Sequence, residues 1–257
     1  MPTIKPGRPE DQTAQGRARQ PVVQPIILLG GFASPAALYA GLRDRLAELS
    51  GQPVWVVPTL TIDWLPSIVP AGWALLLAKL QQSVQQALGR STTGKVTLIG
   101  HSAGGVLARL YLAPEPFVGR VFGGIEHVDQ LITLGSPHTN QERWLHGGLM
   151  SRWIERRYPG AFYGEQVRYT SVAGRMMRGN RHGSLLERNA YRFYVKIAGE
   201  GDVWGDGLIP VQAALLKGAQ QIVLEGVSHF TGFGGPWYGA EQVLPRWWQE
   251  SQAPLGE

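Results

Sequence analysis

A serine enclosed by glycines is the residue of this sequence best suited to chemistry. Ser102 lies in the stretch GHSAG, residues 100–104, which has the pattern G-x-S-x-G. The apolar run KVTLIG leads into this stretch, and the helical pattern AGGVLARLYLA follows Ser102. This is the arrangement of a nucleophile elbow, a strained strand-to-helix turn that exposes a serine hydroxyl. Gly100 and Gly104 are expected where a side chain would collide with the strand or helix. The alternative is an incidental glycine-rich turn, because so short a pattern also arises by chance.

A serine hydroxyl is a poor nucleophile unless a base takes its proton. The chain has six histidines. His229, in the stretch EGVSHF, follows the last predicted strand, where a loop can bring it over Ser102, so we predict that it is the base. His138, after TLGSP, is the alternative, and otherwise lines the rim of the pocket. His101 lies inside the elbow and is expected to face away from the reaction.

The base in turn needs an acid that orients it. The stretch GDVWGDGLIP, residues 201–210, offers Asp202 and Asp206. Asp206 is favoured because it starts a tight loop that ends in proline, whereas Asp202 is suited to capping a turn. The resulting order of serine, aspartate and histidine along the chain is the order found in α/β-hydrolases.

An acyl-transfer site also needs backbone donors for a developing oxyanion. Ala103 follows the serine and opens the predicted helix, so its N–H is one expected donor. The loop Gly30-Gly31-Phe32 follows the first predicted strand, and Phe32 is the expected second donor. A plain strand-end turn is the alternative reading of this loop.

The elements that must position these residues alternate between strand and helix. Several predicted strands are apolar throughout, which is typical of a parallel sheet covered on both faces. We predict an α/β fold with a mostly parallel central sheet flanked by helices. Strands are predicted at 25–32, 53–58, 95–100, 129–138, 167–174, 190–199 and 219–230, and helices at 35–50, 70–88 and 103–113.

The composition is that of one globular domain. The chain has 257 residues, 44% of them hydrophobic, and no cysteine, which excludes disulfides and thiolate chemistry. Residues 1–24 are predicted to be a flexible tail without the apolar core of a signal peptide, and residues 25–257 a single domain. With no apolar run long enough to span a membrane, the expected location is cytoplasmic.

The net charge of +5 is concentrated in one segment. Between residues 150 and 192 there are nine arginines and three glutamates. Such a segment is either a solvated face or a surface that attracts anionic lipid headgroups. No recognition motif accompanies the charge, so nucleic acid is not an expected partner.

Five stretches together resemble the α/β-hydrolase superfamily, and within it the lipase-like esterases. They are ILLGGF, LIGHSAGG, LITLGSPH, WGDGLIP and VSHF, in the family's order between residues 26 and 230. The resemblance implies a cap or lid, placed at about 139–165 and 174–189. One departure concerns the oxyanion loop, where Gly30 stands at a position that holds histidine in many such lipases.

The sequence thus predicts a serine hydrolase that cleaves carboxylic esters through an acyl-enzyme on Ser102, with His229 as the base and Asp206 as the acid. The resemblance implies that the esters are lipid acyl esters. Transfer of the acyl group to an alcohol, or a non-catalytic binding protein on the same fold, are the alternatives. The expected partner is a small-molecule or lipid ester, with peripheral contact to a lipid interface; no metal or organic cofactor is implied. Candidates for the pocket lining are His101, His138, Trp64, Trp73 and Trp144.

Overall fold

The computed structural model describes residues 21–141 and 146–253. Its centre is a six-stranded sheet in the order β2-β1-β3-β4-β5-β8, in which every neighbouring pair is parallel. The predicted α/β class with a mostly parallel sheet is therefore confirmed. The strands are β1 (Ile26–Leu29), β2 (Val54–Val56), β3 (Val96–His101), β4 (Val128–Leu134), β5 (Arg168–Arg175) and β8 (Gln220–Glu225). A separate antiparallel pair is formed by β6 (Met177–Arg178) and β7 (Trp204–Gly205).

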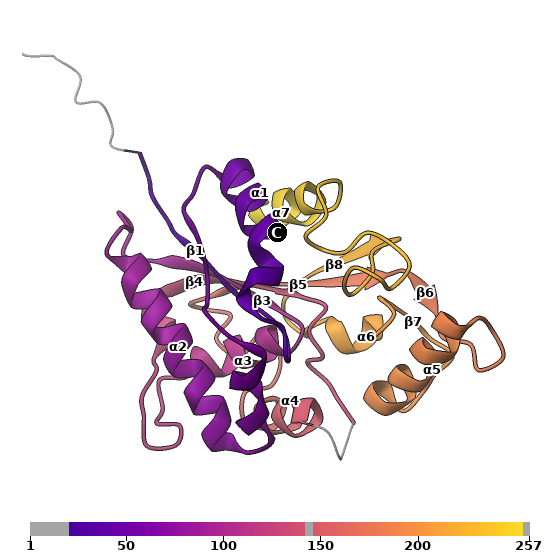
Figure 1. The fold of residues 1–257 in the computed structure, drawn as a ribbon. Helices are drawn as coiled ribbons and strands as arrows, with labels where there is room; N and C mark the ends of the chain where they lie inside the picture. Colours follow the sequence, from indigo (N-terminus) through magenta and orange to yellow (C-terminus); the bar gives the residue numbers. More distant parts are fainter. Residues whose placement is uncertain (1–20, 142–145, 254–257) are drawn as a thin grey trace, which may run out of the picture.

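Helices cover both faces of this sheet. The α-helices are α1 (Ala40–Ser50), α2 (Pro70–Leu88), α3 (Ala103–Tyr111), α4 (His146–Arg157), α5 (Leu185–Ala198), α6 (Val211–Ala214) and α7 (Leu244–Gln252). The 3₁₀ helices are η1 (Ala36–Tyr39), η2 (Thr61–Ile68) and η3 (Gly124–Glu126). Figure 1 shows α1 and α7 on one side of the sheet and α2, α3 and α4 on the other.

The side chains of β1 contribute alternately to the apolar layers on the two faces of the sheet. Successive side chains of a strand point to opposite faces of the sheet. Ile26 and Leu28 belong to the apolar cluster that includes buried residues of α1 and α7. Ile27 and Leu29 belong to the larger cluster formed with α2, α3 and α4. A strand that is apolar at every position thus serves two cores.

The prediction of a strand at residues 190–199 is wrong, because these residues form most of α5. The local run of aromatic and β-branched residues favours a strand. A capping box between Ser184 and Glu187 starts a helix instead. Ala190, Tyr194 and Ile197 then fall at helical spacing and are buried on one face, so packing decides against the local preference.

The parallel register brings the candidate loops to one edge of the sheet. Leu29 of β1 pairs with Gly100 of β3, so the loop after β1 and the turn at Ser102 leave the sheet side by side. At the opposite end of the strands, Val23 and Gln24 are hydrogen-bonded to Thr92 and Gln52. These two residues, which the sequence assigns to the tail, therefore contact the folded chain.

Candidate active site

The backbone at Ser102 is strained. Ser102 is the single residue between the end of β3 and the start of α3. Its φ of 54° and ψ of −128° lie outside the regions that residues with a side chain ordinarily occupy. Such strain persists only where the surrounding structure holds the residue in place. The geometry is that of the predicted elbow.

Two glycines make this turn possible. A Cβ added to Gly100 would lie 2.3 Å from the Cα of Gly105. A Cβ added to Gly104 would lie 2.4 Å from the carbonyl oxygen of Gly30. Both distances are far below van der Waals contact with backbone that has no room to move. Strand, helix and the loop after β1 therefore approach one another closely only because these positions lack side chains.

A hydrogen-bonded chain joins the three predicted catalytic side chains. The Nε2 atom of His229 lies 3.1 Å from the Oγ of Ser102, and its Nδ1 lies 2.8 Å from Oδ2 of Asp206. A carboxylate oxygen accepts, so Nδ1 carries the proton and Nε2 accepts from the serine hydroxyl. The backbone N–H of His229 also donates to the carbonyl of Asp206, at 2.7 Å. These distances are within the range of a general base and its orienting acid.

The Asp206 carboxylate is buried and fully surrounded by donors. Its Oδ1 accepts from the backbone N–H groups of Leu208 and Ile209, at 3.0 and 2.7 Å. Its Oδ2 accepts from the hydroxyl of Tyr238 at 2.8 Å, as well as from His229. Burial, together with the nearby carboxylate, raises the pKa of Tyr238 well above its ordinary value, so this hydroxyl keeps its proton and donates. The donors offset the cost of removing the charge from water.

The alternative acid and base lie in other surroundings. Asp202 is exposed and forms an ion pair with Arg178, at 2.7 Å. His138 is fully buried, with Nε2 2.9 Å from Oγ1 of Thr133 and Nδ1 3.4 Å from a guanidinium nitrogen of Arg109. Since Arg109 can only donate, Nδ1 accepts and Nε2 carries the proton. Burial and the Arg109 charge hold the pKa of His138 well below its usual range.

A second hydrogen-bonded chain, which the sequence analysis missed, links the predicted oxyanion loop to His229. The Gly31 N–H donates to the hydroxyl of Tyr39, and this hydroxyl lies 2.8 Å from Nδ1 of His101. Nε2 of His101 lies 3.1 Å from the His229 carbonyl. Because that carbonyl can only accept, Nε2 carries the proton and Nδ1 accepts from Tyr39. We call this arrangement the Tyr39–His101 chain.

Burial fixes the protonation of this chain. It raises the pKa of Tyr39 to about 12 and lowers the pKa of His101 well below its ordinary value. The ring of Tyr39 also explains the departure at Gly30, since a Cβ there would lie 2.5 Å from a ring carbon. No signal within a single sequence identifies Tyr39 or Tyr238, because His101 and Asp206, which they contact, lie 62 and 32 positions away along the chain.

The two predicted oxyanion donors, Ala103 and Phe32, belong to segments that meet at Ser102. Ala103 is the first residue of α3, so its N–H has no acceptor within the helix. The loop that carries Phe32 passes so close that a Cβ on Gly31 would lie 2.8 Å from the Cβ of Ser102. The N–H of Gly31 is engaged by Tyr39. Phe32 as the second donor stays a prediction.

Comparison with solved structures identifies the architecture. A protein described as a cell surface hydrolase from Lactobacillus plantarum WCFS1 superposes with a TM-score of 0.51 at 12% identity, over 92% of this chain and 95% of that one. Est1E from Butyrivibrio proteoclasticus gives 0.50 at 12% identity, over 91% and 90%. With the parallel sheet and the elbow described above, these matches decide the fold. This is the α/β-hydrolase fold.

Other comparisons cover less of this chain. A family model described as a PGAP1-like alpha/beta domain matches residues 75–153, which include the elbow. Aspergillus fumigatus lipase B is 14% identical over 78% of this chain, with a TM-score of 0.46. The chain spans 44% of the length of that lipase. No curated protein matches the sequence significantly.

The predicted pocket aromatics have different environments within the α/β-hydrolase fold. Trp64 is fully buried and packs edge-on against Phe32 of the loop after β1, with ring centroids 5.9 Å apart. Trp73 is also fully buried and stacks on Phe117. It is a core residue rather than part of an open pocket wall. Trp144 lies outside the described residues.

The predicted cap segments contain α4 and the start of α5. In the first segment, Met150 and Ile154 of α4 are buried in the same apolar cluster as α2 and α3. The second segment contains β6 and the loop that leads to α5. A lid role for these segments stays a prediction, as does the division of the chain into tail, domain and cap.

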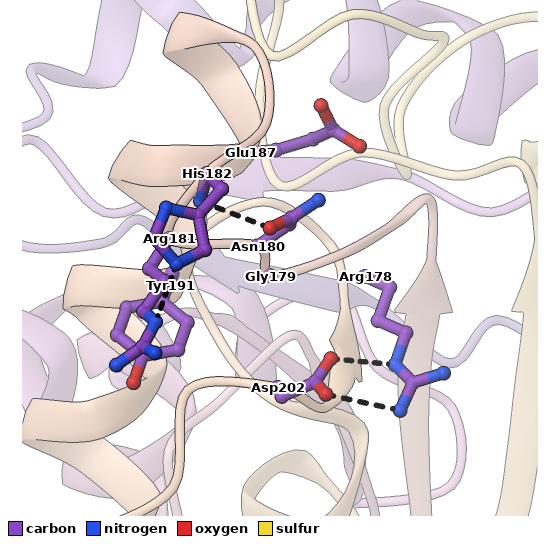
Figure 2. A pocket seen from close by; sticks show the side chains of 8 residues that line it. All are labelled: Arg178, Gly179, Asn180, Arg181, His182, Glu187, Tyr191 and Asp202. Carbon is purple, nitrogen blue, oxygen red and sulfur yellow. Dashed lines mark hydrogen bonds and ion pairs between the residues drawn. The ribbon is translucent and has the colours of Figure 1, made fainter.

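A surface hollow of about 590 Å³ lies between the loop after β6 and α5. Figure 2 shows Arg178 and Asp202 facing each other across one side of it, and Arg181 against His182 on the other. The residues that line it do not include the Ser102, His229 or Asp206 side chains. The hollow is therefore separate from the candidate active site. Two of its ionic groups, Arg178 and Asp202, are paired with each other.

Two further observations concern the described ranges 21–141 and 146–253. Within them, no three histidine or acidic side chains are grouped as a metal site would require. None of their helices has the length and hydropathy needed to cross a bilayer.

Proposed function

We propose that this protein hydrolyses carboxylic esters through an acyl-enzyme on Ser102. The observation that carries the proposal is the hydrogen-bonded chain from Ser102 through His229 to the buried Asp206, with distances of 3.1 and 2.8 Å. The strained elbow and the α/β-hydrolase fold support it, because this fold uses the same order of nucleophile, acid and base. Fold alone does not assign an activity, so the side-chain geometry is the stronger support.

In the proposed reaction, the Oγ of Ser102 attacks the ester carbonyl while Nε2 of His229 takes its proton. Asp206 holds the imidazole and stabilises its positive charge. The N–H groups of Phe32 and Ala103 donate to the oxyanion of the tetrahedral intermediate. His229 then returns the proton to the leaving alcohol, and a water molecule, activated by the same imidazole, releases the acid.

Substitution of the nucleophile tests this proposal. We expect Ser102→Ala to lower kcat for a p-nitrophenyl ester by about 10⁴-fold or more, because oxyanion donors alone retain little of the rate. A fluorophosphonate probe should label the wild-type protein and Ser91→Ala, in which a serine of an unrelated turn is replaced, but not Ser102→Ala. Wild-type turnover by Ser102→Ala would refute the assignment. An unlabelled wild-type protein would favour a non-catalytic binding protein.

The proposal also concerns which acyl group the protein accepts and whether water or an alcohol receives it. We propose lipid acyl esters as substrates, since Phe32 is partly exposed and belongs to the loop whose Gly31 lies against Ser102. A series of esters from acetate to palmitate should show turnover that rises with chain length. A sharp optimum at short soluble esters would contradict the lipid assignment. Product analysis with added alcohols separates hydrolysis from acyl transfer.

A further inference from the structure

The 3₁₀ helix η2 has an exposed apolar face. Ile62, Leu65 and Ile68 repeat at intervals of three, the spacing at which a 3₁₀ helix places side chains on one face. They are 64%, 62% and 51% exposed. Trp64 and Ser67, on the other side of the helix, are buried. The helix is therefore amphipathic, but with a large apolar face in solvent.

The residues that flank η2 extend this face. Leu60 precedes the helix and Val69 follows it, and both are exposed. We call Leu60, Ile62, Leu65, Ile68 and Val69 the apolar stripe. Single exposed aliphatic residues are normal on a protein surface, whereas a continuous group of this kind marks a contact surface.

Helix η2, which carries the apolar stripe, contacts the loop that follows β1. Oγ1 of Thr61, at the start of η2, donates to the carbonyl of Ala33, at 3.1 Å. The ring of Trp64 packs against Phe32, which is itself 45% exposed. Gly31 of the same loop lies against Ser102, so η2 and the candidate nucleophile both contact this loop.

Positive charge lies on α4, a helix that packs against η2. Trp153 of α4 lies edge-on to Trp73, near the start of α2. A shallow hollow of about 550 Å³ on α4 is lined by Leu149, Arg152, Trp153, Arg156 and Arg157. The acidic residue of η2, Asp63, is neutralised by Lys79 at 2.6 Å. An apolar face with a cationic border is the arrangement that binds an anionic membrane surface.

We propose that the apolar stripe and the arginines of α4 dock the protein on a bilayer that contains anionic lipids. The aliphatic side chains enter the acyl region while the arginines contact the headgroups. A second copy of the chain fits this surface less well, because a symmetric contact would bring the arginine borders of both copies together. The proposed esterase activity supplies the reason for docking on a membrane. Membrane binding itself does not depend on that activity and is measurable without turnover.

Vesicle sedimentation tests the docking surface. We expect the protein to bind vesicles in which phosphatidylglycerol replaces one-third of the phosphatidylcholine, and to bind pure phosphatidylcholine much more weakly. The triple variant Ile62→Ser/Leu65→Ser/Ile68→Ser should bind the anionic vesicles at least about tenfold more weakly. The double variant Arg156→Gln/Arg157→Gln should bind anionic vesicles roughly thirtyfold more weakly than the wild type, with no change on pure phosphatidylcholine.

A matched control replaces three exposed aliphatic residues elsewhere, Leu185→Ser/Val195→Ser/Val223→Ser, and should bind as the wild type does. Ser102→Ala should also bind normally, which separates docking from turnover. All surface variants should hydrolyse a short soluble ester at the wild-type rate, showing that they fold. Equal vesicle binding by the stripe variant and the wild type would overturn the proposal. So would a wild-type dimer in sedimentation velocity that the stripe variant dissociates.

Discussion

At Ser102 and its neighbours, the direction of each hydrogen bond is fixed by groups that can only donate or only accept. The carbonyl of His229 fixes the proton on His101, and the Asp206 carboxylate fixes the proton on His229. As a result, Tyr39 has one available role, to accept from Gly31 and donate to His101. The geometry of the oxyanion loop is thereby connected to the position of the predicted base.

Removal of one hydroxyl tests this connection. Tyr39→Phe keeps the ring but leaves the Gly31 N–H and Nδ1 of His101 without a partner, which should lower the free energy of unfolding by about 1–3 kcal/mol. We also expect kcat for a soluble ester to fall roughly tenfold with little change in KM, because the oxyanion contact strengthens in the transition state.

Tyr111→Phe is the matched control for this prediction. The Tyr111 hydroxyl is buried, with no hydrogen-bond partner among the described residues, so its removal should change neither stability nor kcat appreciably. If Tyr39→Phe lowers stability but leaves kcat at the wild-type value, Tyr39 supports the fold without positioning the oxyanion loop.

At the scale of elements, one buried guanidinium connects α3 to the segment around α4. Arg109 is 2% exposed. It donates to a carboxylate oxygen of Glu155 at 2.8 Å and to the carbonyls of Tyr158 and Gly160, at 2.6 and 3.1 Å. Glu155 is partly exposed, so the hydrogen bonds from Arg109 to the two buried carbonyls contribute more than the ion pair itself. Arg109 thus holds the predicted cap segment to the helix that follows Ser102.

We expect Arg109→Met to lower the free energy of unfolding by about 3–5 kcal/mol, because it leaves two buried carbonyls and a carboxylate without their donor. Glu155→Gln should lower the free energy of unfolding by only about 1 kcal/mol, since its amide oxygen still accepts the hydrogen bond from Arg109. Urea unfolding measures both. Arg156→Met, at an exposed position of α4, should stay within about 0.5 kcal/mol of the wild type. Similar losses in all three variants would argue against a special role for Arg109.

At the scale of the whole molecule, burial of neutral histidines links stability to pH. His101 and His138 both have pKa values well below 6.5 in the folded protein, His101 mainly through burial and His138 through burial and Arg109. In the unfolded chain they take up protons near pH 6.5. The unfolded state then binds more protons than the folded one, so stability falls as the pH drops below this value.

Between about pH 6.5 and pH 5, we expect the free energy of unfolding to fall by up to about 3 kcal/mol per pH unit from the two histidines together. His138→Gln, whose amide can still accept from Arg109 and donate to Thr133, should reduce this slope by about half. Urea unfolding at a series of pH values measures it. A stability that is constant over this range would contradict the prediction.

The sequence by itself determined the alternation of strands and helices and the sharp turn at Ser102, because both depend on residues that are neighbours along the chain. Local pattern misled at residues 190–199, where burial of Tyr194 on one face outweighed strand propensity. The tertiary structure decided which candidate groups meet: Asp206 rather than Asp202 contacts His229, and Tyr39 and Tyr238 complete the surroundings. Such contacts join residues tens of positions apart, and only the packing of the sheet and its helices sets the distance between them.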